Sequence, residues 1–258
     1  MTTLTSADGT TIAFDRTGDG PPVILVGGAL SNRFADAQLA ELLAPQFTVI
    51  TYDRRGRGDS GDGAAYAVDC EIEDLQALIE QAGGSAFVYG TSSGGNLALE
   101  AATRGPGIGK LALWEPNFLV DDSRPPLPDD YVEHVNELVA AGRRGDAVEY
   151  FMTTAVGMPA EFVAPMRELP MWPGMEQAGP TLAYDGTVVA GFALDAARLG
   201  SLRTPTLVLD GGQVPWMSNG ARALAEALPQ AQRRTLDGQP HNVAADAVAP
   251  ALREFFAA

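Results

Sequence analysis

The sequence predicts an α/β protein with a mostly parallel, doubly wound sheet and an inserted helical cap. Two observations support this prediction. Short apolar runs with β propensity alternate with helical patterns at both ends of the 258-residue chain, and this alternation stops in the middle. Alternation of this kind is typical of parallel sheets, because each parallel crossover needs a connection that is usually a helix. The interruption in the middle predicts the insertion.

The N-terminal part of the chain begins with a hairpin, since Asp8-Gly9 is a turn signal between two β-type runs. One helix is well marked, because Ile72, Leu75 and Ile79 recur at helical spacing. The strands expected here are residues 2–5, 11–14, 22–26, 47–52, 87–89 and 111–114. The helices expected between them are residues 39–43, 68–81 and one that begins at 96.

Residues 117–191 show no convincing alternation of strand and helix patterns. A proline-rich connection at 124–128 precedes short helices, of which the clearest are expected at 129–141, 146–156 and 160–169. The alternation then returns. The remaining elements expected are strands at 206–209 and 232–236 and helices at 218–228 and 244–256. We therefore expect a core of residues 1–116 and 192–258 and a helical lid of residues 117–191.

The charge of the chain excludes some partners. It carries 33 acidic and 17 basic residues, which give a net charge of −16. Nucleic acids and anionic membranes would repel such a chain. Cys70 is the one cysteine, so an internal disulfide is excluded and a reducing compartment is favoured. There is no signal-like N-terminus and no apolar run of about 20 residues. We expect a cytoplasmic protein that binds a small molecule; its oligomeric state is left open.

The segment Gly90-Thr91-Ser92-Ser93-Gly94 fits the G-x-S-x-G pattern of a nucleophile elbow. A β-type run precedes it and a helical run follows it, as this strand–turn–helix motif requires. Glycines two positions before and after the serine avoid collisions in a strained turn. The helix N-terminus behind the serine favours negative charge. The pattern therefore points to Ser92 as a nucleophile, although a glycine-rich turn without chemistry has the same letters.

A serine nucleophile needs a base, and the chain has two histidines. His134 lies in a helical pattern inside the expected lid and is interpreted as an ordinary helix residue. His241 lies in a loop between the last strand and the last helix, where an α/β sheet presents reacting groups. We predict His241 as the general base.

Four segments together make the chain resemble the α/β-hydrolase-fold superfamily, of the serine-hydrolase type with a helical lid. They are the Gly27-Gly28-Ala29 loop, the polar loop of residues 52–60, the Gly90–Gly94 elbow and the Pro240-His241 loop. The resemblance implies that the backbone N–H groups of Ala29 and Ser93 bind the oxyanion. The family pattern has a His-Gly pair where this chain has Gly27-Gly28, but backbone donors do not depend on side-chain identity.

The acid of the triad departs from the family pattern. Most relatives place an aspartate shortly after the strand that is here 206–209, and the register puts Val214 there. Some family members place the acid after the preceding sheet strand, where this chain has Glu115. We predict Glu115 as the acid, because an unpaired carboxylate at the end of an apolar strand would be costly. Asp210 is the second candidate, and a site without an acid is the third.

The expected lid is rich in methionine and aromatic residues. Five of the seven methionines fall between positions 152 and 175. Such residues form either the core of the lid or the apolar wall of a substrate pocket, because methionine adapts to irregular ligands. The candidates for substrate contact are Leu30, Met152, Met166, Trp172 and Trp216. The arginines of residues 53–57 are interpreted as a structural ion-pair loop.

The predicted function is hydrolysis or acyl transfer on an ester or thioester of a small hydrophobic molecule, through an acyl-enzyme on Ser92. No cofactor or metal is expected, because no cluster of histidine, cysteine and carboxylates has ligand spacing. Two alternatives remain. One is a non-hydrolytic acyltransferase or lyase-like step in specialised biosynthesis, and the other is a non-catalytic protein that binds a small molecule.

Overall fold

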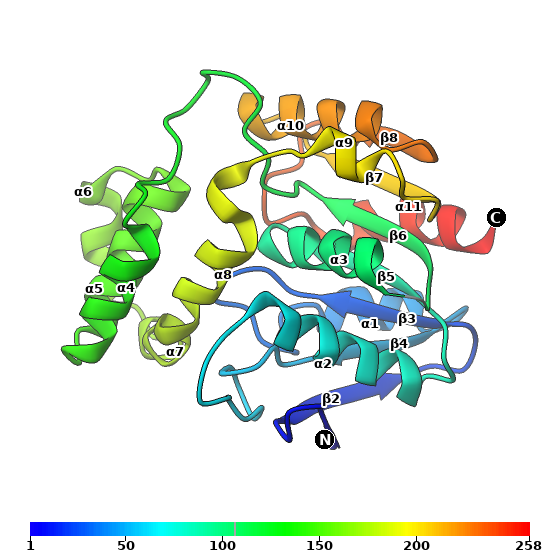
Figure 1. The fold of residues 1–258 in the computed structure, drawn as a ribbon, viewed down its shortest axis with the longest axis horizontal. Helices are drawn as coiled ribbons and strands as arrows, with labels where there is room; N and C mark the ends of the chain where they lie inside the picture. The colour runs from blue at the N-terminus through cyan, green and yellow to red at the C-terminus, as the bar shows by residue number, and fades with distance from the viewer. Residues whose placement is uncertain (106) are drawn as a thin grey trace.

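The computed structural model describes residues 1–105 and 107–258, and its centre is an eight-stranded sheet (Figure 1). The strands are β1 (Thr2–Thr5), β2 (Thr11–Thr17), β3 (Pro22–Val26), β4 (Thr48–Tyr52), β5 (Ala86–Thr91), β6 (Ile108–Trp114), β7 (Thr206–Asp210) and β8 (Ala231–Thr235). Their order is β1-β2-β4-β3-β5-β6-β7-β8. Strands β1 and β2 are antiparallel to their neighbours. The other six strands, β3 to β8, are mutually parallel. The predicted fold class is confirmed.

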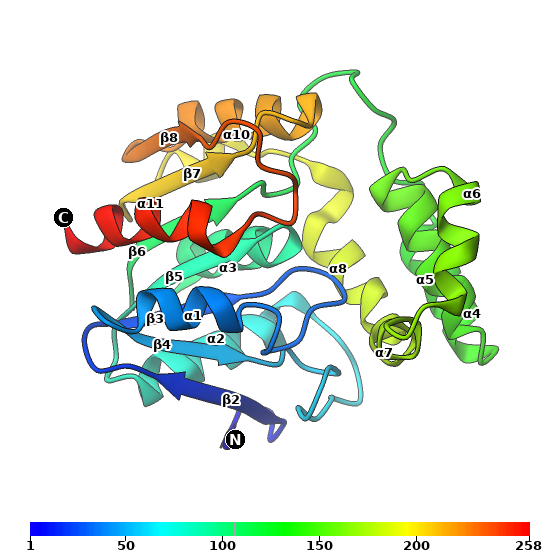
Figure 2. The same cartoon turned by 180° about the vertical axis from the view of Figure 1, so that it is seen from behind.

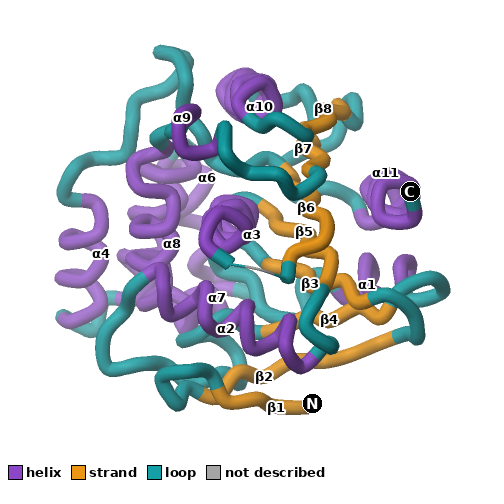
Figure 3. The backbone as a smooth tube through the Cα atoms, turned by 45° about the vertical axis from the view of Figure 1, so that its right-hand side comes forward, coloured by secondary structure: helices purple, strands orange, loops and turns teal. Residues whose placement is uncertain are grey.

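Helices cover both faces of the sheet, as Figure 2 and Figure 3 show. One face carries α1 (Ala37–Leu43) and α11 (Ala245–Ala257). The opposite face carries α2 (Val68–Gln81), α3 (Ser93–Arg104) and α10 (Pro215–Ala227), and the short α9 (Ala196–Leu199) lies near α10. The sheet therefore has two separate apolar cores, one under each helical layer.

Strand β3 shows how the sequence builds both cores at once. Its residues from Val23 to Val26 are all buried. Ile24 and Val26 join the core under α2 and α3, whereas Val23 and Leu25 join the core under α1 and α11. Successive side chains of a strand point to opposite faces, so a continuous apolar run is required where both faces are covered.

The middle of the chain is helical and gathers beyond the carboxyl ends of the parallel strands, with α8 between α3 and the other helices (Figure 1). These helices are α4 (Tyr131–Ala140), α5 (Arg144–Tyr150), α6 (Ala160–Val163), α7 (Trp172–Ala178) and α8 (Leu182–Val189). The helix expected at 146–156 continues as a π-helical turn from Phe151. The one expected at 160–169 changes to a 3₁₀ turn at Ala164, next to Pro165, which lacks an N–H donor. That these helices act as a lid remains a prediction.

A third apolar cluster joins these helices to the sheet layer. It contains Met152 and Trp172 from the middle of the chain together with Trp216 of α10, and Ala29 and Leu30 pack against it. The cluster therefore lies between the middle helices and the loops at the carboxyl edge of the sheet. Among the described helices, none is both long and apolar enough to cross a membrane.

Candidate active site

Ser92 stands between β5 and α3 in a strained turn. Its backbone has φ 53° and ψ −128°, a conformation that residues with a side chain rarely adopt. A Cβ on Gly90 would lie 2.6 Å from the carbonyl oxygen of Gly94, and a Cβ on Gly94 would collide with the carbonyls of Val26 and Gly27. The glycines on either side of Ser92 are therefore required by close backbone approach. The first turn of α3 starts at the next residue, with its positive dipole end at the serine.

His241 and Glu115 meet across the edge of the sheet. The Nδ1 atom of His241 lies 2.7 Å from Oε2 of Glu115. The other carboxylate oxygen accepts a hydrogen bond of 3.0 Å from the N–H of Gly211, and Glu115 has no exposed surface. The backbone of the histidine is also held, because its carbonyl accepts a 2.7 Å bond from the indole N–H of Trp114. The imidazole is therefore fixed through Nδ1, and its side chain remains 34% exposed.

Asp210 is buried at the end of the neighbouring strand but has other partners. Its carboxylate pairs with Arg233 at 2.8 Å and accepts a 2.9 Å hydrogen bond from the hydroxyl of Ser218. Val214 packs against the third apolar cluster at the start of α10. Of the two carboxylates considered from the sequence, Glu115 is thus the one that contacts His241.

The hydroxyl of Ser92 contacts Asn117, which carries no sequence pattern that singles it out. The side-chain amide of Asn117 donates a 3.2 Å hydrogen bond to Oγ of Ser92. The side-chain amide of Asn96 in α3 holds the backbone of Asn117: it accepts a 2.8 Å hydrogen bond from the Asn117 N–H and donates one of 3.1 Å to the Asn117 carbonyl. Within the described chain, no hydrogen bond joins Ser92 to His241. Catalytic hydrogen bonds often form only when substrate is bound.

The Gly27-Gly28-Ala29 loop lies directly against the serine. A Cβ on Gly28 would be 3.0 Å from the Cβ of Ser92. The carbonyl oxygen of Gly28 accepts hydrogen bonds of 2.6 Å from both Oγ of Ser31 and Nη1 of Arg57. Ser93 is the first residue of α3, so its N–H has no acceptor within the helix. The backbone of Ala29 and that of Ser93 thus flank the serine from two elements.

Behind these two loops lies a buried cluster of ionic side chains. Arg54 contacts Glu71 at 2.6 Å and Asp185 at 2.8 Å, and Arg57 contacts Asp185 at 2.7 Å. Ser93 joins the cluster by donating a 2.7 Å hydrogen bond from its hydroxyl to Asp185. The expectation of a structural ion-pair loop agrees with these contacts. Asp185, which comes from α8, had no sequence signal as a partner.

The charges of this cluster support one another. Burial by itself raises the pKa of Asp185, but the combined effect of the neighbouring Arg57 and Arg54 is larger and lowers it. The pKa therefore lies below its ordinary value of 3.8. Burial likewise raises the pKa of Glu71 and Arg54 lowers it, and the resulting pKa lies below the ordinary value of 4.5. Both carboxylates are therefore held as anions, Asp185 by Arg54 and Arg57 and Glu71 by Arg54.

The five residues expected to contact substrate all belong to the third apolar cluster or its border. Met152, Trp172 and Trp216 are buried in the cluster, and Leu30 and Met166 pack against it half-buried. Leu30 directly follows the loop at Ser92 and has a positive φ of 60°. Leu30 therefore links the loop that lies against Ser92 with the third apolar cluster.

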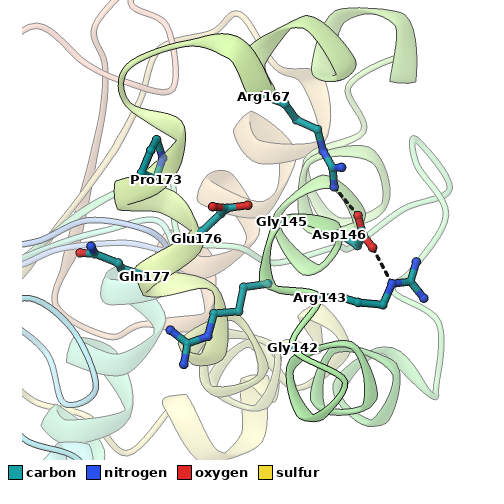
Figure 4. Close-up of a pocket in the computed structure, with 9 residues that line it drawn as sticks. Gly142, Arg143, Gly145, Asp146, Arg167, Pro173, Glu176 and Gln177 are labelled. Carbon is teal, nitrogen blue, oxygen red and sulfur yellow. Dashed lines mark hydrogen bonds and ion pairs between the residues drawn. The ribbon is translucent and has the colours of Figure 1, made fainter.

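A polar depression of about 480 Å³ lies between α5 and α7, and Figure 4 draws the residues that line it. Its lining residues are Gly142, Arg143, Arg144, Gly145, Asp146, Arg167, Pro173, Glu176 and Gln177. Neither Ser92 nor His241 lines it, and its charges are largely paired with one another, as between Arg167 and Asp146. The depression is therefore separate from the site at the end of the strands.

The model of the alpha/beta hydrolase family matches residues 23–251. An alpha/beta hydrolase from Sphaerobacter thermophilus has a crystal structure that is 57% identical, with a TM-score of 0.94 over 99% of this chain and 100% of that one. A non-heme haloperoxidase of Rhodococcus erythropolis is 26% identical over 94% of this chain and 93% of its own length. A bifunctional esterase/perhydrolase of Acinetobacter calcoaceticus is 26% identical over 93% and 92%, respectively.

These similarities extend over nearly the whole chain, including the middle helices, and the TM-score of 0.94 shows that the fold is shared. The relatives' names describe enzymes, which supports an enzyme of the hydrolase kind here. The chain belongs to the alpha/beta hydrolase family.

Proposed function

We propose that this protein is a serine hydrolase that cleaves esters or thioesters of small hydrophobic molecules through an acyl-enzyme. The observation that carries the proposal is the 2.7 Å contact between Nδ1 of His241 and buried Glu115, beside the strained elbow that presents Ser92. A carboxylate on Nδ1 keeps the proton there and leaves Nε2 free to act as a base.

In the proposed mechanism, Oγ of Ser92 attacks the carbonyl carbon of the substrate while Nε2 of His241 takes the hydroxyl proton. The carbonyl oxygen becomes an anion, which the backbone N–H groups of Ala29 and Ser93 bind. Donors of this kind act on charge that develops only in the transition state and are worth about 3 kcal/mol each. The tetrahedral intermediate collapses, and His241 returns the proton to the leaving alcohol or thiol.

Deacylation repeats these steps with water. His241 removes a proton from water, the resulting hydroxide attacks the acyl carbon, and the acid product leaves as Ser92 recovers its proton. The partly buried Leu30 and Met166 and the buried Met152, Trp172 and Trp216 are proposed to form the apolar wall for the substrate. Their shared cluster beside the Ala29 loop supports an apolar acyl or alcohol group.

Labelling with a fluorophosphonate probe tests the nucleophile. We expect the wild-type protein to be labelled and to hydrolyse p-nitrophenyl esters, and we expect Ser92→Ala to lose both. Ser201→Ala is the matched control, because Ser201 is exposed and lies after α9, away from the site. Equal labelling of Ser92→Ala and wild type would contradict the proposal. Saturable ligand binding without turnover would instead favour the non-catalytic alternative.

Acyl transfer to an acceptor other than water is a second candidate function. The names of two relatives, a haloperoxidase and an esterase/perhydrolase, favour hydrogen peroxide as such an acceptor. Peroxide would attack the same acyl-enzyme and release a peracid in place of the acid. Product analysis with acetate esters and added peroxide or alcohol decides between the two; release of the free acid alone in every mixture would exclude transfer.

A further inference from the structure

The carbonyl of Gly28 is held by two side chains, and this has a consequence for the next N–H group. In a trans peptide the C=O and the following N–H point in opposite directions. The carbonyl of Gly28 and the N–H of Ala29 belong to one peptide plane. The hydrogen bonds of 2.6 Å from Arg57 and from Ser31 therefore fix the direction of the proposed oxyanion donor as well as that of the carbonyl.

We propose that Arg57, anchored by Asp185 of α8, is a positioning residue that orients the Ala29 N–H group for oxyanion binding. This inference rests on the proposed serine hydrolase function. Arg57 does not touch the substrate in this proposal; it acts through the peptide between Gly28 and Ala29.

Each nitrogen of the Arg57 guanidinium donates one hydrogen bond, and the side chain is almost fully enclosed. Arg57 is 3% exposed. Its Nη1 donates to the Gly28 carbonyl, its Nη2 to Oδ2 of Asp185 at 2.7 Å, and its Nε to the hydroxyl of Thr181 at 3.1 Å. Thr181 and Asp185 both come from the middle of the chain. The planar fork thus holds the loop at a set distance from α8, which a flexible point charge could not do.

Asp185 connects the same arginine to the second proposed donor. Its Oδ2 pairs with Arg57, and its Oδ1 accepts hydrogen bonds from Arg54 at 2.8 Å and from the hydroxyl of Ser93 at 2.7 Å. Arg54 also reaches the carbonyl of Gly27 at 3.3 Å. The carboxylate of Asp185 therefore connects the loop that contains Ala29, through Arg57, with Ser93, the residue that follows Ser92.

The Gly27-Gly28 pair explains why the loop needs this support. Glycine populates a wide range of backbone angles, so the peptide between Gly28 and Ala29, which follows two glycines, turns more easily than a peptide that follows residues with side chains. Oxyanion donors act only when they are aimed at the developing charge, and removal of one such donor reduces kcat about 10²–10³-fold. A partial rotation of the Ala29 peptide should therefore lower kcat more than it weakens substrate binding.

Arg55 provides a matched control in the same loop. It is also buried and pairs with carboxylates, with Asp74 and Asp8 each at 2.8 Å. Its contact with a backbone carbonyl is to Cys70, not to the loop at Ser92. Replacement of either arginine by methionine removes a buried charge from residues 53–57, but only replacement of Arg57 releases the Gly28 carbonyl.

The experiment compares Arg57→Met, Arg57→Lys and Arg55→Met in ester hydrolysis, with the folded fraction measured by circular dichroism. We expect Arg57→Met to lower kcat by about 10–100-fold with little change in KM, and to weaken binding of a boronic acid transition-state analogue in parallel. Arg57→Lys keeps the positive charge beside Asp185 and should fold, yet kcat should still fall, because lysine cannot make the three contacts together. Arg55→Met should lose stability without this loss of kcat per folded molecule.

A kcat of Arg57→Lys equal to that of wild type would overturn the proposal, and so would equal kcat losses in folded Arg57→Met and Arg55→Met. In both cases Ser92-dependent labelling of the wild type would persist, and the proposed function would stand. If the wild type showed no Ser92-dependent turnover, the proposed function and this inference would fall together.

Discussion

Two buried carboxylates lie at the ends of neighbouring strands, and the side chains that they contact give them different roles. Glu115 follows β6 and contacts His241, whereas Asp210 ends β7 and contacts Arg233 and Ser218. Each carboxylate satisfies the rule that a buried charge needs a partner. Their partners therefore predict different consequences when the charge is removed.

Replacement of Glu115 by glutamine should lower kcat by roughly 10²–10⁴-fold, because the amide no longer stabilises the imidazolium or keeps the proton on Nδ1. Asp210→Asn is the matched variant and should leave kcat nearly unchanged while it weakens the ion pair with Arg233. Steady-state kinetics with p-nitrophenyl esters and urea unfolding measure the two effects. Undiminished kcat in Glu115→Gln would remove that residue from the proposed triad.

At the scale of elements, α8 is attached to the core by both aromatic and ionic contacts. The ring of Tyr184 stacks on that of Tyr66 with centroids 3.9 Å apart, and its hydroxyl donates to Asp62 at 2.8 Å. The next residue, Asp185, enters the arginine cluster. We therefore infer that α8 remains with the sheet layer, and any opening of the predicted lid must occur in the helices before it.

The ionic attachment of α8 predicts a dependence of stability on pH. The pKa values of Asp185 and Glu71 in the folded protein lie below 3.8 and 4.5, their ordinary values. A carboxylate with a lowered pKa stabilises the fold fully above its unfolded pKa and loses that contribution as pH falls through its folded pKa. The free energy of unfolding should therefore decrease below about pH 4.5 as these groups are protonated.

Asp185→Asn should have a shallower loss of stability with acid than the wild type, and a lower stability at neutral pH. Asp36 affects the pH dependence of stability with the opposite sign. Burial raises its pKa to about 6, so its contribution to stability is lost as pH rises towards that value. The comparison of the two proteins in urea at several pH values isolates Asp185. Parallel curves for wild type and variant would contradict this attachment.

At the scale of the whole molecule, the three apolar clusters are not independent. Trp216 and Met217 lie on α10, which covers the sheet, yet they belong to the cluster that contains the middle helices. The two cores of the sheet share the strands between them. Apolar burial thus continues from one end of the molecule to the other, which favours unfolding as a unit.

Two variants with different tryptophans removed test this cooperativity. Trp114 lies in the core under α1 and α11, and Trp172 lies in the third cluster. Fluorescence of Trp114→Phe then reports mainly on the third cluster, and fluorescence of Trp172→Phe includes the sheet core. After allowance for the stability change in each variant, its fluorescence and circular dichroism transitions in urea should coincide. An earlier fluorescence transition in Trp114→Phe would show that the middle helices unfold separately.

Local patterns predicted most elements and failed where the helix type changes. Residues 68–81 were expected as a helix and form α2 with those bounds, because their apolar spacing is strong. Residues 146–156 were expected as one helix, but the turn type changes at Phe151, a preference that side-chain periodicity does not encode. The short helices α7, α8 and α9 were not specified, since each depends more on packing than on length.

The sequence by itself determined the strands and most helices of the core, the serine in its glycine-flanked turn and the one histidine in a suitable loop, because each depends on neighbouring residues. Only the tertiary structure decided that Glu115 rather than Asp210 meets His241, across 126 positions of the chain. It also decided that Asp185 joins Arg57, across 128 positions. Contacts at such separations follow from the packing of whole elements, and a buried charge takes whichever partner that packing places beside it.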